Sequence, residues 1–163
     1  MRIEPVIAPA GTFKLLQRSL MMFYTGHERS ADGPLRKQCE AVQNGRAVDA
    51  LCRMRDLAFE FRERLSHGDV DGLVPLLREN WQLKRGLADE ISSSEIDRWF
   101  ERALAAGAGA GKILGAGAGG FLVLLTPPER QDAVRAALPD LRELTLRFSS
   151  HGTQISVLGE REF

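Results

Sequence analysis

Cysteine is scarce in this chain, and the residues that usually bind metals do not gather anywhere along it. Its only two cysteines, Cys39 and Cys52, both lie in patterns that are typical of helices. The three histidines are scattered and show no spacing of metal ligands. Two cysteines cannot build a disulfide framework. The sequence therefore predicts no metal site and no disulfide, and it fits a reducing cytoplasm.

A charge excess and a long apolar run are also missing. The 22 basic and 22 acidic residues give a formal net charge of zero, which argues against nucleic acid or an anionic membrane as the main partner. No apolar run approaches the ~20 residues of a membrane-spanning helix. The 163 residues with 44% hydrophobic content suffice for one well-packed core. We therefore expect a single domain over residues 1–163, with neither nucleic acid nor membrane as a partner.

The chain does contain alternating helical and strand patterns. In order, we expect a short strand over 3–7, a turn or helix over 11–17, a strand over 20–24, three helices between 51 and 105, a strand over 121–125, a helix after 126, and strands over 144–148 and 153–158. Capping boxes are predicted at Ser92–Glu95 and Thr126–Glu129. This order favours an α+β fold, a two-layer sandwich of a mostly antiparallel sheet with helices on one face.

Two helical stripes of apolar residues are expected to face the core. The first consists of Leu51, Met54, Ala58, Phe61 and Leu65, and the second of Ile96, Trp99, Phe100, Ala103 and Leu104. On the helix between them, the polar residues Asn80 and Lys84 continue an apolar face. Either they mark the end of the buried part of this helix, where a long side chain reaches solvent, or their side chains line a polar pocket.

A run of glycine and alanine separates two apolar segments and is the most unusual feature of the sequence. Between Leu114 and Phe121 no side chain is larger than a methyl group, which suits close approach of the backbone to another backbone or to a phosphate. A P-loop is excluded because Ile113 stands where that motif needs a hydroxyl. A dinucleotide fingerprint is excluded because the run leads into a strand rather than a helix. A strand–glycine loop–strand unit remains.

The residues of this run resemble the third motif of the GHMP small-molecule kinases, a loop of the form K-L-x-G-A-G-G-G-G between two strands. The matching residues are Lys112 to Gly120, with Ala118 in place of one glycine. Within that family the chain is most similar to the sugar kinases that act on heptose 7-phosphate, through Phe23 to Gly26, Arg29 to Ala31, and Glu79 to Trp81 with Lys84. The resemblance implies the ferredoxin-like C-terminal domain of such a kinase.

The resemblance also implies site residues. Those of the phosphate or ATP loop are Lys112, Gly115, Gly117, Gly119 and Gly120, and those that bind substrate are Thr25, Gly26, Arg29, Ser30, Asn80, Trp81 and Lys84. Simpler interpretations stand beside these: a loop that serves backbone packing, an Arg29 paired with Glu28 or solvent, and a Trp81 that belongs to the core. No pair of carboxylates suggests a catalytic base, and no catalytic or metal-binding residue is nominated.

Members of this family are about twice as long, and their N-terminal half supplies the main phosphate loop and the catalytic aspartate, neither of which occurs here. We therefore expect a C-terminal domain that lacks its N-terminal ATP-binding half, and that is inactive as a sugar kinase without it. ATP and magnesium are implied for the complete kinase, with no cofactor required by this chain alone. The expected partners are the N-terminal half and a sugar phosphate, and self-association through an exposed apolar face is also expected. The alternatives are a non-catalytic binding or assembly module and a stand-alone ferredoxin-like domain that binds a small molecule.

Overall fold

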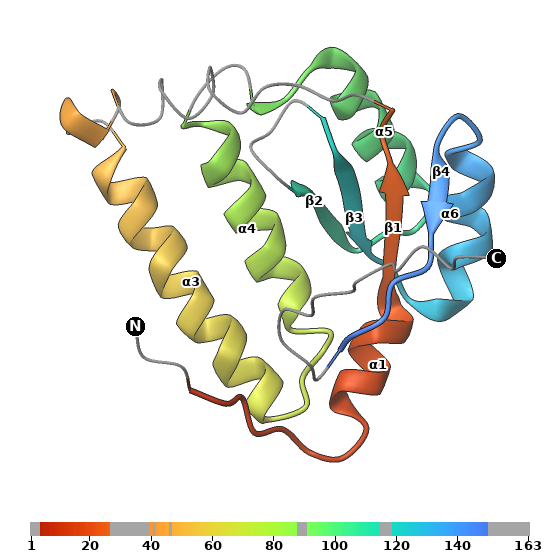
Figure 1. The fold of residues 1–163 in the computed structure, drawn as a ribbon, viewed down its shortest axis with the longest axis horizontal. Coiled ribbons are helices and arrows are strands. Elements are labelled where there is room, and N and C mark those ends of the chain that lie inside the picture. The colour runs from red at the N-terminus through yellow and green to blue at the C-terminus, as the bar shows by residue number, and fades with distance from the viewer. Residues whose placement is uncertain are drawn as a thin grey trace, which may run out of the picture.

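The computed structural model describes residues 4–26, 40, 42–45, 47–87, 91–114 and 119–149, and its centre is a four-stranded sheet (Figure 1). The strands are β1 (Leu20–Tyr24), β2 (Ala110–Leu114), β3 (Phe121–Leu125) and β4 (Arg142–Leu144). They lie in the order β2-β3-β1-β4, and every neighbouring pair is antiparallel. The strand predictions over 20–24 and 121–125 are confirmed with the same bounds. The α+β fold class is confirmed as well.

Helices surround this sheet. They are α1 (Thr12–Ser19), α3 (Val48–Ser66), α4 (Leu73–Arg85), α5 (Ser94–Ala105) and α6 (Gln131–Ala137), with a short 3₁₀ turn, η2 (Pro128–Arg130), before α6. In Figure 1, α3 and α4 lie side by side on the β2 side of the sheet, whereas α6 lies on the β4 side. The three helices predicted between the first two strands of the sheet are therefore present. Among the residues that the structure describes, no helix has the length and apolar character needed to cross a membrane.

The register of the strands sorts their side chains onto two faces. Because successive residues point to opposite faces, the pairing places Phe23 beside Leu122, and Leu122 beside Ile113, on one face. All three are almost completely buried. They form the main core with residues of α5 and α6 and with the residue that follows α6, which are Ile96, Trp99, Phe100, Ala103, Val134 and Leu138. This face of the sheet is therefore covered by α5 and α6.

The same register places Lys112, Val123 and Met22 on the opposite face. A second apolar cluster forms on that face around Leu125, the last residue of β3, and its other buried members are Leu16, Leu65, Val70 and Leu73. These residues come from α1, the end of α3, the connection after it and the start of α4. The second cluster therefore fixes α4 along β2, which is an edge strand of the sheet.

The edge of β2 is shielded by side chains of the two flanking helices. Trp81 of α4 and Phe100 of α5 stack across it with ring centroids 5.1 Å apart and ring planes at 24°. Both rings are buried. An uncovered edge strand invites pairing with other chains, and this aromatic pair covers the β2 edge from both sides.

Several sequence predictions about local structure are wrong. Residues 4–7 form no strand, and the strand expected over 144–148 lies instead at Arg142–Leu144. It ends there because the chain leaves β1, and the Phe148 N–H donates to Oε1 of Gln17 at 2.8 Å. The strand predicted over 153–158 lies outside the described residues. The turn or helix predicted over 11–17 is the helix α1.

The two predicted capping boxes are also wrong. At α5 the cap is Ser93, whose hydroxyl accepts from the Ile96 N–H at 3.2 Å, while the Ser92 hydroxyl donates to Asp97. The hydroxyl of Thr126 is buried and has no hydrogen-bond partner. Two prolines follow Thr126, and because proline has no N–H, one of the donors that a capping threonine would accept from is missing.

Two members of the predicted core stripes, Ala58 and Leu104, are exposed, and three more, Leu51, Met54 and Phe61, are half-buried. Ala58 is exposed and Leu57, one position earlier, is buried in its place. The α3 helix meets α4 on the side that carries Leu57 and Leu65, so Leu57 takes the buried place that was predicted for Ala58, while Leu65 is buried as predicted. Leu104 is 40% exposed because the last turn of α5 extends past the main core. The other four residues of the α5 stripe are buried as predicted.

Candidate functional site

The end of β1 is anchored to the last residue of the glycine loop. The backbone N–H and the hydroxyl of Thr25 both donate to the carbonyl oxygen of Gly120, each at 3.0 Å. Gly120 has a φ of 96°, and a Cβ there would lie 3.0 Å from the carbonyl oxygen of Leu114. Only glycine adopts this conformation readily. Thr25, a predicted substrate residue, therefore holds Gly120, the last residue of the glycine loop, at the end of β1.

The structure describes some of the neighbouring predicted site residues and not others. Gly26 is exposed with a φ of 75°, so its glycine is required by conformation rather than by space. Gly119 is buried beside Gly120. Four further predicted site residues, namely Arg29, Ser30, Gly115 and Gly117, lie outside the described residues. For all of these, contact with a ligand stays a prediction.

Two predicted residues that are far apart in the sequence meet in the structure. The Nζ of Lys112, on β2, donates to Oδ1 of Asn80, on α4, at 3.2 Å. Lys84 lies one helical turn after Asn80, so it occupies the same side of α4. Lys112 stands two residues before the end of β2, about 7 Å along the strand from the start of the glycine loop. Asn80, Lys84 and Lys112 together are called the lysine cluster below.

The two lysines of this cluster sit in an environment that disfavours positive charge. Partial burial lowers the pKa of Lys112. Burial also lowers the pKa of Lys84, and the positive charge of Lys112 lowers it further. Removing solvent from an ammonium group and placing a second one nearby both raise the energy of the charged form. An anion bound beside the two lysines would stabilise their charged forms and raise their pKa values again. The cluster is therefore electrostatically suited to a phosphate or carboxylate.

Beside the lysine cluster the helices α3 and α4 leave a cleft of about 320 Å³ that reaches Lys112. Asn80 and Lys112 supply its polar side chains. The remaining lining residues are apolar: Leu57, Ala58 and Phe61 of α3, with Leu76 and Leu77 of α4. A cleft with mostly apolar walls and a few convergent polar groups is the usual form of a small-molecule site.

The position of α4 beside α3 is fixed by a residue that the sequence analysis missed. The guanidinium of Arg53 donates to both carboxylate oxygens of Glu79, at 2.6 and 2.8 Å, and also to Glu60. Because Arg53 bridges the helices immediately before Asn80, it holds that turn of α4 in place. Glu60 follows Arg53 by seven residues on the same face of a helix, but only the tertiary structure reveals Glu79 as the partner.

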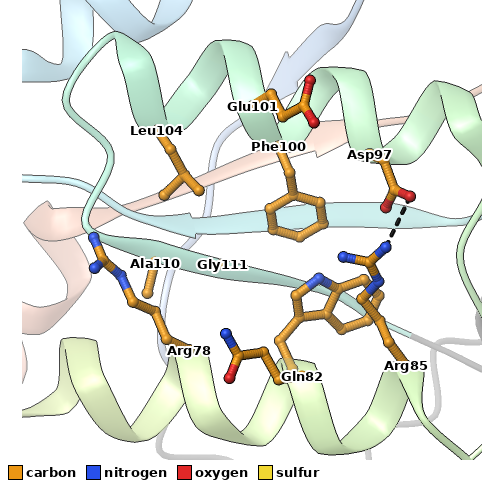
Figure 2. Close-up of a pocket in the computed structure, with 10 residues that line it drawn as sticks. Arg78, Gln82, Arg85, Asp97, Phe100, Glu101, Leu104, Ala110 and Gly111 are labelled. Atoms are coloured by element: carbon orange, nitrogen blue, oxygen red, sulfur yellow. Dashed lines mark hydrogen bonds and ion pairs between the residues drawn. The ribbon is translucent and has the colours of Figure 1, made fainter.

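Trp81 does not join the lysine cluster. It lies in a different groove, between α4 and α5, where its ring packs on Phe100. Consecutive residues of a helix point about 100° apart, so Asn80 and Trp81 face different cavities. Figure 2 shows that groove, with Phe100 projecting from α5 toward α4. The structure therefore places Trp81 in the core, as the simpler sequence interpretation expected, and its contact with a sugar stays a prediction.

The antiparallel sheet, with the hairpin of β2 and β3 at its edge and the lysine cluster beside β2, can be compared with known proteins. Residues 47–142 match the family model described as "GHMP kinases C terminal". This match covers more than half of the chain, and the chain belongs to the GHMP kinase family.

Individual relatives agree with this assignment. The chain is 25% identical over 116 residues to a D-glycero-alpha-D-manno-heptose 7-phosphate kinase of Campylobacter jejuni. The aligned region covers 71% of this chain and 34% of that protein. The chain thus spans about a third of that curated relative. A putative sugar kinase of the same organism shares the fold with a TM-score of 0.65 at 22% identity, over 93% of this chain and 42% of the other. The L. major mevalonate kinase has a TM-score of 0.64 at 23% identity, over 76% and 40%.

Proposed function

We propose that this chain is the C-terminal part of an ATP-dependent sugar kinase, which transfers the terminal phosphoryl group of ATP to a sugar or to a sugar phosphate such as heptose 7-phosphate. The observation that carries the proposal is the hydrogen bond between Lys112 and Asn80. It joins a residue of the predicted phosphate loop to a residue of the predicted substrate site. Membership of the GHMP kinases and the likeness to a heptose 7-phosphate kinase support it.

The chemistry of phosphoryl transfer suits what the lysine cluster can supply. Such a transfer depends mainly on positioning and on charge stabilisation. Lys84 and Lys112 offer two ammonium groups in a partly buried place, where each attracts a phosphate more strongly than it would in water. Asn80 orients one of them. The role of these residues is to hold an anionic group of the acceptor or of the nucleotide close to the glycine loop.

Magnesium, which the family resemblance implies for the complete kinase, does not fit the lysine cluster. Ammonium groups are donors without a lone pair and cannot ligate a cation. Within the described ranges, no three His, Cys, Asp or Glu side chains are grouped so that they could hold a metal ion. No step is assigned to magnesium on this chain, and its ligands are expected from the N-terminal half.

We infer that the chain needs an N-terminal half to act as a kinase, because the family's main phosphate loop and catalytic aspartate are not found in it. The purified chain is expected to show no ATP-dependent phosphorylation of heptose 7-phosphate. When combined with an N-terminal half encoded upstream or in a neighbouring gene, it is expected to gain that activity. Turnover by the chain alone, after contaminating kinases are removed, would contradict the inference. No turnover with any such half would favour a non-catalytic binding module.

Binding by the chain itself is tested more directly. Heptose 7-phosphate is expected to raise the melting temperature of the chain, and the Lys112→Met variant is expected to lose most of that shift, because methionine keeps the apolar stem without the charge. The matched control is Lys14→Met, which removes an exposed lysine of α1. Equal shifts for Lys112→Met and for the control would remove Lys112 from the site.

A further inference from the structure

A second groove lies on the other side of α4, along the shielded edge of β2. It measures about 390 Å³ and runs between α4 and α5, as Figure 2 shows. Trp81, Phe100, Ala110 and Gly111 supply its apolar and backbone surface. None of its lining residues belongs to the lysine cluster, and Trp81 is its only lining residue among the predicted kinase site residues.

Both helices contribute polar side chains to this groove. Arg78, Gln82 and Arg85 follow one another at intervals of four and three residues on α4, which places them on one face of the helix. At one end of the groove Arg85 donates to Asp97 of α5 at 2.8 Å, so these two charges neutralise each other (Figure 2). At the opposite end Arg78 faces Leu104 of α5 (Figure 2), and this end is open to solvent because both side chains are exposed.

Arg78 is held in a defined orientation at the open end. Its Nε donates to the carbonyl oxygen of Gly109 at 2.6 Å. Within the part of the chain that the structure describes, its two terminal nitrogens have no hydrogen-bond or ion-pair partner, and neither has the amide of Gln82. A guanidinium fixed through Nε presents its remaining N–H groups as a fork, which matches the two oxygens of a carboxylate.

The surroundings of Arg78 select among anions. Leu104 is 40% exposed at the open end, and the ring of Phe100 lies next to it in the groove, so a ligand there meets apolar surface on one side. Glu101 also lines the groove, and no ion pair engages it among the described residues. In Figure 2 the Glu101 carboxylate points away from Arg78, so Arg78 supplies a single positive charge at the open end, which a monoanion balances and a dianion such as a phosphate exceeds.

We propose that the open end of this groove binds a small monocarboxylate with an apolar body. The carboxylate accepts from the terminal nitrogens of Arg78 and from the Gln82 amide. The apolar body lies against Leu104 and Phe100. This site is separate from the lysine cluster, and its existence does not depend on the kinase proposal.

The test compares four probes that differ in one property each, with the complete chain and calorimetric or NMR titration. Phenylacetate carries both the carboxylate and the apolar body, acetate lacks the body, 2-phenylethanol lacks the charge, and phenyl phosphate replaces the carboxylate by a dianion. Phenylacetate is expected to bind at least about tenfold more tightly than each of the others, a difference of about 1.4 kcal/mol. Equal or tighter binding of phenyl phosphate, or no binding of phenylacetate, overturns the proposal.

Two variants locate the binding. Arg78→Met removes the guanidinium and is expected to reduce phenylacetate binding to the level of 2-phenylethanol, whereas Arg98→Met, an exposed arginine of α5, leaves it unchanged. Because Arg78 also bonds to Gly109, its replacement could disturb folding. Leu104→Asn changes an exposed residue instead, and is expected to weaken phenylacetate at least fivefold while acetate binding is unaffected. Unchanged phenylacetate affinity in Leu104→Asn, like unchanged affinity in a folded Arg78→Met variant, overturns the proposal.

Discussion

At the scale of single residues, two buried threonines differ in what their hydroxyl groups contact. The Thr25 hydroxyl donates to Gly120, whereas the Thr126 hydroxyl has no partner. Thr126→Val is expected to raise the free energy of unfolding by about 1 kcal/mol, because valine has the same shape and leaves no buried polar group unpaired. Thr25→Val is expected to lower it by about 1 kcal/mol, because it removes a hydrogen bond from the glycine loop. Urea denaturation followed by circular dichroism measures both.

The two threonine variants serve as controls for each other, since the chemical change is the same. Opposite signs are the expected outcome. A loss of stability in Thr126→Val equal to that in Thr25→Val would mean that the Thr126 hydroxyl makes a stabilising interaction, and would contradict the description of its surroundings.

The lysine cluster is expected to make the stability of the chain depend on pH. Burial lowers the pKa of Lys112, and burial together with the charge of Lys112 lowers that of Lys84. Such a lysine binds fewer protons in the folded than in the unfolded chain, so stability rises with pH between the lowered pKa and the ordinary value of about 10.4. The native chain is therefore expected to gain stability relative to Lys112→Met as the pH approaches about 10.4.

The measurement is a series of urea denaturation curves from neutral pH to about 10.4 for the native chain, Lys112→Met and Lys14→Met. The exposed Lys14 provides the control, whose stability should run parallel to that of the native chain. A constant difference between the native chain and Lys112→Met over this range would show that Lys112 is as well solvated when folded as when unfolded.

At the scale of elements, the strand β2 leaves no room for a side chain at Gly111. A Cβ at this position would lie 2.6 Å from both Leu124 Cδ2 and the Val123 carbonyl oxygen, and 3.0 Å from the Phe100 ring. The backbone oxygen cannot move away without disturbing the β2–β3 pairing. Gly111→Ala is therefore expected to destabilise the fold by about 1–3 kcal/mol, as overpacked core substitutions do.

Gly86, at the end of α4, is the control for this substitution. Its φ is −71°, and the nearest atom to a Cβ there lies at 3.4 Å, so Gly86→Ala is expected to change stability by less than about 1 kcal/mol. Thermal denaturation of both variants compares them. Equal melting temperatures would show that β2 and β3 have room for the additional methyl group.

Prediction from sequence succeeded for those elements whose pattern reflects local burial. The strands Leu20–Tyr24 and Phe121–Leu125 are continuous apolar runs between turn residues, and their bounds were predicted correctly. The bounds of β4 were not, because a three-residue edge strand is defined by its pairing with β1 rather than by its own composition. The burial of Leu57 in place of Ala58 has the same origin, since α4 determines which residues of α3 are buried.

At the scale of the whole molecule, apolar side chains are exposed where the glycine loop leaves the sheet. Leu114 and Phe121 flank that loop and are 38% and 36% exposed, and the ring of Phe121 contacts that of Tyr24 at 5.6 Å. The register puts all three on the face that also carries Lys112. We expect this surface to drive self-association of the isolated chain, as exposed apolar patches commonly do.

Sedimentation velocity over a range of concentrations tests this expectation. The native chain is expected to associate, and Phe121→Thr, which keeps a strand-forming residue, is expected to shift the population toward monomer. Phe59→Thr provides the control, because Phe59 is 62% exposed on α3 and lies in a different element. A native chain that stays monomeric, or a Phe59→Thr variant with the same effect, would count against association through the face beside the glycine loop.

The sequence by itself determined the α+β class, the two central strands and the glycine-joined hairpin, because continuous apolar runs and a side-chain-free loop restrict the local backbone wherever they occur. Only the tertiary structure decided which polar residues meet. Asn80 and Lys112 are 32 positions apart, and they are neighbours because the second apolar cluster holds α4 along β2. Trp81, next to Asn80 in the sequence, faces another groove because a helix turns by about 100° per residue. The pattern of the chain indicates candidates, and packing between distant elements determines which of them share a site.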